Sequence, residues 1–224
     1  MTFSIIARCR KTGQFGAAVA SSSPAVAARC IRARAGIGAA ASQNITDPAL
    51  GPQALDLMAA GQAPDQALAM LQQKPFSAYR QLMAIDADHP PAIFTGDSAL
   101  GTLASVTGEH AACAGNMLAN RDVPAAMLAA FERSEGAALA DRLMQALLAG
   151  QAAGGEEGPV HSAGLLVVDT LDWPIVDLRL DWVENGPVEA LDAAWQVFAP
   201  QVNDYITRAR DPRAAPSFGV PGNL

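Results

Sequence analysis

Lysine is scarce in this chain of 224 residues, where only Lys11 and Lys74 occur. The 15 basic residues are outnumbered by 22 acidic ones, which gives a formal net charge of −7. A protein that binds a nucleic-acid backbone needs a dense group of positive charges, because it must neutralise phosphates. The composition therefore argues against nucleic acid as a partner.

Long hydrophobic runs are also missing. No stretch reaches the roughly 18 apolar residues that a membrane-spanning helix needs. Residues 1–8 carry no basic segment followed by a long apolar run and a cleavage site, as a signal peptide would. We therefore expect a cytoplasmic protein without a membrane partner.

Cysteine and ligand motifs are too sparse to suggest a metal or a cofactor. The three cysteines show no CxxC spacing, and the three histidines have no partner four residues away. A disulfide framework or a structural zinc site would need such spacings. No GxGxxG, P-loop or GxSxG signature occurs either. We expect no metal, no cofactor and cysteines that are mostly buried.

Aromatic residues make up only 5% of the chain, whereas alanine is abundant. The core must then be built from small and aliphatic side chains, which lets packed layers approach closely. The length suits one domain, which we place at residues 1–207. Residues 208–224 are rich in proline and glycine, and we expect a tail without regular structure that lies on the surface or on a partner subunit.

Hydrophobic periodicity predicts blocks of strands that alternate with groups of helices. The expected strands are 2–7, 15–21, 35–41, 80–86, 91–95, 103–106, 111–114, 162–168 and 175–180. The expected helices begin near 51 and span 64–73, 123–131, 137–148 and 187–198. Hairpin-linked strands favour mainly antiparallel sheets, and grouped helices favour outer helical layers. The pattern predicts an α+β fold of two facing sheets with helices on both outer faces.

The second residue offers possible chemistry. Removal of Met1, common before a small residue, would leave Thr2 with a hydroxyl and a free α-amine. An α-amine titrates near pH 8 and can accept the proton of the hydroxyl, as in enzymes with an N-terminal threonine nucleophile. Alternatively, Thr2 only begins a strand.

Seven segments of the chain, in order, carry a family resemblance. They are MTFSIIAR (1–8), VASSSPAV (19–26), RAGIGA (34–39), GNML (115–118), GQAAGG (150–155), HSAGLLVV (161–168) and VDLRLD (176–181). The chain resembles the DUF1028 family, a domain of unknown function placed by its fold with the N-terminal-nucleophile (Ntn) hydrolases. The resemblance implies a four-layer αββα sandwich, in agreement with the layers expected from the pattern.

The resemblance also implies hydrolysis of an amide bond in a small or peptide-like metabolite, through an acyl-enzyme on Thr2. The developing oxyanion needs donors, and Asn116 can offer its side-chain amide and nearby backbone N–H groups. Asn116 is equally suited to a left-handed turn before a helix.

Other polar residues are candidates for binding the substrate. Ser21 and Ser22 close a strand next to the first one, so they can bond to the Thr2 site or simply end the strand. Gln43, Asn44 and Asp47 follow the third strand, where they suit polar substrate groups or a turn with the next proline.

One departure from the family pattern concerns positive charge. Many threonine Ntn enzymes keep a lysine beside the nucleophile, but Lys11 is expected in a turn and Lys74 at a helix end. Arg34 or Arg179 could supply the charge, although a guanidinium does not act as a base. For Arg179 we favour a salt bridge with Asp177 or Asp181 instead.

Two further features leave alternatives open. The low-complexity stretch 150–158, with Glu156 and Glu157, is either a mobile lid or a solvated loop. If Met1 is retained, Thr2 has no free amine, which would favour a non-catalytic Ntn-fold protein that binds a ligand or serves in assembly.

The apolar, acidic chain with its proline-rich tail also predicts a homodimer or higher homo-oligomer.

Overall fold

The computed structural model describes residues 1–217, which form two antiparallel sheets. The six-stranded sheet has the order β10-β9-β2-β1-β8-β7. Its strands are β1 (Thr2–Arg8), β2 (Phe15–Ser21), β7 (Ala104–Thr107), β8 (Ala111–Asn116), β9 (Ser162–Val168) and β10 (Val176–Leu180). The four-stranded sheet has the order β3-β4-β5-β6. Its strands are β3 (Ile31–Arg34), β4 (Gly38–Asn44), β5 (Arg80–Ile85) and β6 (Ala92–Thr95).

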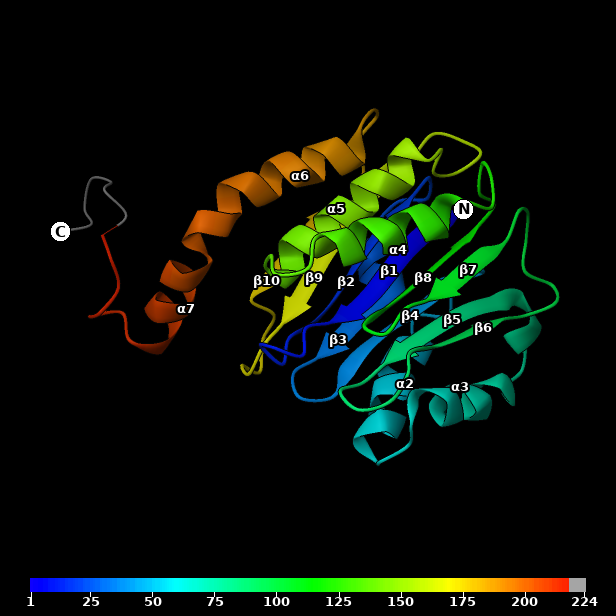
Figure 1. The fold of residues 1–224 in the computed structure, drawn as a ribbon, viewed down its shortest axis with the longest axis horizontal. Coiled ribbons are helices and arrows are strands. Elements are labelled where there is room, and N and C mark those ends of the chain that lie inside the picture. Colours follow the sequence, from blue (N-terminus) through cyan, green and yellow to red (C-terminus); the bar gives the residue numbers. More distant parts are fainter. Residues whose placement is uncertain (218–224) are drawn as a thin grey trace.

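Helices pack against each sheet on the side away from the other sheet (Figure 1). The six-stranded sheet is covered by α4 (Val123–Arg133), α5 (Leu139–Ala152) and α6 (Pro187–Phe198). The four-stranded sheet is covered by α2 (Leu50–Ala59) and α3 (Pro64–Gln72). The remaining helical elements are α1 (Val26–Cys30), η1 (Ser77–Tyr79), η2 (Ala199–Gln201) and α7 (Val202–Arg210). The α+β prediction with two mainly antiparallel sheets is confirmed.

The period-2 pattern of β1 explains how one strand serves two cores. Phe3, Ile5 and Ala7 belong to the apolar cluster under α4 and α5. Ile6 belongs to the cluster between the two sheets. Because alternate residues of a strand share a face, Thr2 and Ser4 also face the space between the sheets.

Small residues let neighbouring backbones approach closely, as the composition predicts. An added Cβ at Gly164 of β9 would lie 2.3 Å from the Cβ of Ala27 in α1. Cys30 and Cys113 are buried and Cys9 is half-buried. Among the described residues, no helix combines the length and the apolar character needed to cross a membrane.

Three segments differ from the sequence-based expectations. The strand expected at 35–41 is a turn at 35–37 followed by β4, because Gly36 adopts a left-handed φ of 70°. Residues 26–32, for which no helix or strand was expected, form α1 and the start of β3. Helix α7 includes residues 208–210, so regular structure extends into the expected tail. Residues 218–224 of that tail lie outside the described residues.

Candidate functional site

A row of polar side chains crosses four strands at one end of the six-stranded sheet. Thr2 pairs with Asn116 of β8, and Ser21 pairs with Ser162 of β9. Phe3 pairs with Ala20, which brings Thr2 next to Ser21. All four polar residues are buried, and the alternation of β1 directs the row into the space between the sheets.

The four-stranded sheet places a second polar row opposite the first. Gln43 pairs with Gln81, and Gln81 pairs with Thr95. The Gln43 side-chain amide donates to Gln81 Oε1 at 2.8 Å. The Gln81 amide donates to Thr95 Oγ1 at 3.1 Å. Both glutamines are fully buried.

Hydrogen bonds join the two rows. Ser4 Oγ donates to Gln43 Oε1 at 2.6 Å, and Asn116 Nδ2 donates to Gln81 Oε1 at 3.3 Å. Asn116 Oδ1 is buried without a hydrogen-bond partner among the described residues. Because buried polar atoms are usually paired, this oxygen is a free acceptor in the layer that contains Thr2.

The Thr2 hydroxyl lies in a chain of hydroxyl groups. Thr2 Oγ1 and Ser21 Oγ each donate to the main-chain carbonyl of Met1 and lie 3.4 Å apart. Ser21 Oγ lies 2.9 Å from Ser23 Oγ, which accepts a bond from Arg29 Nη2 at 2.7 Å. The guanidinium of Arg29 therefore lies at the far end of this chain of hydroxyl groups. The sequence analysis did not identify Arg29 as a site residue.

Glu156 is the second residue that sequence reasoning missed. Its side chain is buried, at 5% exposure, and both carboxylate oxygens accept the backbone N–H of Ser22 at 3.1 Å. Burial raises the pKa of Glu156 to about 7, against the opposing effects of the N-terminal amine, Ser22 and His161. A carboxyl group that titrates near neutrality thus lies where the chain begins.

The sequence contained a partial signal for Glu156. Gly154 and Gly155 adopt left-handed φ angles of 119° and 57°, and they turn the chain back after α5. Glu156 then forms a bridge with Leu118. The loop 153–158 therefore buries one glutamate, whereas Glu157 is exposed. The glycines predict a turn, but they do not tell which of two adjacent glutamates points inward.

Three predicted site residues are not brought to Thr2. Arg34 donates to Asp56 at 2.8 Å on the surface, and it pairs with Gly38, roughly 17 Å along β4 from Gln43. Asn44 ends β4 with a left-handed φ of 73°, and neither polar atom of its side chain has a hydrogen-bond partner among the described residues. Asp47 Oδ1 accepts the Ala49 N–H at 3.0 Å and forms the turn before α2.

Neither lysine lies at Thr2. Lys11 is in the turn at the opposite end of β1, and Lys74 follows α3. The predicted salt bridge of Arg179 is confirmed, since its Nε and Nη2 donate to both carboxylate oxygens of Asp177 at 2.7 and 2.8 Å. Within residues 1–217, no group of three or more His, Cys, Asp or Glu is arranged to hold a metal ion.

The comparison with protein families matches residues 2–191 to DUF1028, described as a family of unknown function. The chain belongs to the DUF1028 family. The resemblance expected from the sequence motifs is thereby confirmed. This DUF1028 protein is also similar to a solved structure, protein SPO2555 from Silicibacter pomeroyi, which is itself described as DUF1028. The two share 32% identity and a TM-score of 0.81, over 88% of this chain and 89% of that chain.

Two further comparisons say less about the DUF1028 protein. Anbu (ancestral beta-subunit) from Yersinia bercovieri aligns over 91% of this chain and 97% of that chain, with 10% identity and a TM-score of 0.38. A similarity at that level does not bear on the fold or the function. No curated protein matches this chain in sequence.

Proposed function

We propose that this protein is an Ntn-type amidohydrolase with a four-layer αββα arrangement, which cleaves an amide bond of a small or peptide-like metabolite with Thr2 as nucleophile. One observation carries the proposal. The hydroxyl of the second residue is buried between the sheets, beside Ser21 and Asn116, and the Glu156 carboxyl group, whose pKa is about 7, accepts the N–H of Ser22, the residue that follows Ser21. Such a perturbed group beside a nucleophile is typical of active sites.

The contacts of Met1 suggest where a substrate would bind. The Met1 carbonyl oxygen accepts hydrogen bonds from Thr2 Oγ1 and Ser21 Oγ. An added Cβ at Gly158 would lie 3.2 Å from Met1 Cε, so the Met1 side chain lies against the end of loop 153–158. Removal of Met1 would free both hydroxyls and leave space for a substrate carbonyl.

In the proposed reaction, the free α-amine of Thr2 takes the proton of Oγ1 as Oγ1 bonds to the substrate carbonyl carbon. The tetrahedral intermediate collapses, the C–N bond breaks, and the ammonium proton passes to the leaving nitrogen. The resulting ester on Thr2 is attacked by water, whose proton goes to the same amine. Cleavage of the ester releases a carboxylic acid and returns the hydroxyl to Thr2.

The neighbouring side chains would support this reaction in distinct ways. The Asn116 amide is a donor for the oxyanion, provided that its bond to Gln81 is exchanged for one to the substrate. Ser21 is a second hydroxyl donor. Glu156 would hold the Ser22 backbone and interact with the ammonium form of the Thr2 amine. The Ser22 side chain is then available for polar substrate groups, whereas Gln43 would support the site through its bonds to Ser4 and Gln81.

The experiment that tests this function measures mass and covalent labelling together. We expect the intact mass of untagged protein to show the loss of one methionine. A β-lactone electrophile should then add one acyl group to Thr2, located by peptide mapping, and Thr2→Ala should abolish the adduct. Thr2→Ser, which keeps a hydroxyl and an amine, should retain it.

A second candidate function has its own supporting observation. Met1, when present, satisfies the Thr2 and Ser21 hydroxyls with its own carbonyl, which suits a non-catalytic protein that binds a ligand or serves in assembly. Retention of Met1 in the intact mass, together with no labelling of Thr2, would overturn the hydrolase proposal and support this alternative.

We also propose that the protein forms a homodimer or a higher homo-oligomer. Helix α7 follows α6 beyond the edge of the sheets (Figure 1), and none of its residues is buried. Val197 at the end of α6 is 68% exposed. Light scattering at micromolar concentration should give at least twice the monomer mass, and Val197→Asp should lower it. A monomer mass for the unaltered protein would contradict this proposal.

The cytoplasmic location of the protein remains a prediction from the sequence.

A further inference from the structure

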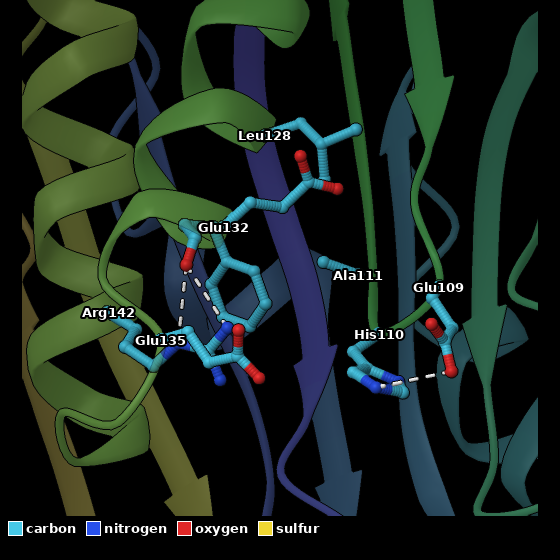
Figure 2. A pocket seen from close by; sticks show the side chains of 8 residues that line it. Glu109, His110, Ala111, Leu128, Glu132, Glu135 and Arg142 are labelled. Carbon is cyan, nitrogen blue, oxygen red and sulfur yellow. Dashed lines mark hydrogen bonds and ion pairs between the residues drawn. The ribbon is translucent and has the colours of Figure 1, made fainter.

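A cavity lies at the other end of β1 from Thr2. It has a volume of about 290 Å³ and opens between α4, α5 and the start of β8 (Figure 2). Ala111 at its base pairs with Ala7, whereas Thr2 pairs with Asn116, so roughly 17 Å of strand separates the cavity from Thr2. The cavity is thus independent of the proposed active site.

The cavity contains a buried guanidinium without an ionic partner. Arg142 of α5 is only 7% exposed. Its Nε and Nη2 donate to the Phe131 carbonyl at 3.3 and 3.1 Å, and its Cζ lies 3.8 Å from the centre of the Phe131 ring. Within residues 1–217, no carboxylate lies within ion-pair distance of Arg142. Burying a charge without a close ion pair is costly, so a further negatively charged group would stabilise this site beyond the longer-range attraction of Glu135.

Carboxylates also line the cavity, but they do not pair with Arg142. Figure 2 shows Glu132 and Glu135 on the same helical side of the cavity as Arg142. An added Cβ at Gly108 would lie 2.8 Å from Glu132 Oε1, so this glycine lets the carboxylate lie close to the β7–β8 turn. A simple anion would be repelled by the two glutamates, and a simple cation by Arg142.

A ligand that carries both charges satisfies both requirements. We propose that this cavity binds a free α-amino acid with an aliphatic side chain. Its carboxylate would take the open side of the Arg142 guanidinium, and its ammonium group would lie against Glu132 and Glu135. Ala111, Leu128 and the Phe131 ring provide an apolar surface for the side chain. The volume is at the lower end of the range for ligand sites, which suits so small a molecule.

Three matched probes separate the charges. They are L-leucine, 4-methylpentanoate, which lacks the amine, and 3-methylbutylamine, which lacks the carboxylate. Calorimetry or ligand-observed NMR on the full chain should show binding of leucine. Each analogue should bind at least about tenfold more weakly, since a charged contact of about 1.4 kcal/mol is lost. Equal binding of 4-methylpentanoate would overturn the zwitterion assignment in favour of a plain anion site.

Variants test the location of the site. Arg142→Met, which keeps apolar packing on Phe131, and Glu135→Gln should each weaken leucine binding at least about tenfold. Arg133→Met, an exposed arginine of α4 outside the cavity lining, is the matched control and should bind normally. Thr2→Ala should also bind leucine normally, which keeps this test separate from the proposed hydrolase. The proposal is overturned if leucine does not bind, or binds equally to Glu135→Gln.

Discussion

Both carboxylate oxygens of Glu156 accept the backbone N–H of Ser22 at 3.1 Å, across 134 residues of sequence. This contact ties the loop after α5 to the end of β2, directly beside Thr2. It also buries the Glu156 carboxyl group near the start of the chain. Burial raises the pKa of this group more than the Ser22 N–H bond and the nearby positive charges lower it.

Stability should therefore fall as pH rises toward neutrality. The Glu156 pKa is about 7 in the folded protein against 4.5 for the free group, so the folded state binds more protons between these values. The free energy of unfolding should decrease through this window, by at most about 3–4 kcal/mol at 1.36 kcal/mol per pKa unit. Glu156→Gln should remove the decrease. Urea unfolding between pH 4.5 and 8 measures it.

The control for this prediction is the adjacent exposed residue. Glu157→Gln should leave the pH dependence unchanged, because the Glu157 side chain is exposed to solvent and is not held in the fold. If Glu156→Gln and the unaltered protein show the same slope, Glu156 does not carry the pH dependence.

Gln81 should contribute strongly to protein stability through its hydrogen bonds in the polar layer between the sheets. Gln81→Leu keeps the volume but removes the acceptor of the Gln43 and Asn116 amides and the donor to Thr95. Buried donors without acceptors should cost about 2–4 kcal/mol of unfolding free energy. Gln73→Leu, at an exposed position after α3, should change it by less than about 0.5 kcal/mol. Equal effects in chemical denaturation would show that the network contributes little.

Arg8 should stabilise the end of the sheets opposite Thr2. Its guanidinium donates to the carbonyls of Asp86, His89 and Glu109 at 2.7–2.9 Å. Arg8→Met should cost about 2–4 kcal/mol, because hydrogen bonds to charged groups are strong. Arg10→Met removes only an exposed ion pair with Glu109, and should cost less than about 1 kcal/mol. Thermal unfolding of the two variants tests this difference, and a matching loss in both would refute it.

Gly164 should be required for the approach of α1 to β9. Gly164→Ala places a Cβ 2.3 Å from Ala27 Cβ, which should destabilise the protein by about 1–3 kcal/mol through overpacking. Ala27→Gly removes the opposing atom, at a helix cost of about 1 kcal/mol. The double variant should then be more stable than the sum of the single effects predicts. Strict additivity in urea unfolding would argue against the contact.

Much of the fold follows from local chemistry in the sequence. The alternation in residues 2–8 and 15–21 predicts β1 and β2, and the leucine spacing after residue 137 predicts α5. The turn at 35–37 was missed because Ile37 and the flanking alanines read as strand, whereas the left-handed Gly36 breaks it. In that segment the composition favoured a strand, but the left-handed conformation of Gly36 forms a turn instead.

By itself, the sequence determined the family, the α+β class and the candidate role of Thr2, because these depend on motifs, periodicity and chain position. Only the tertiary structure decided which polar residues meet. It joined Gln43 to Gln81 and Ser22 to Glu156, and it kept Arg34 with Asp56 on the surface. The physical reason is register, since pairing between strands far apart in sequence sets which alternate side chains share a face. No local pattern encodes that pairing.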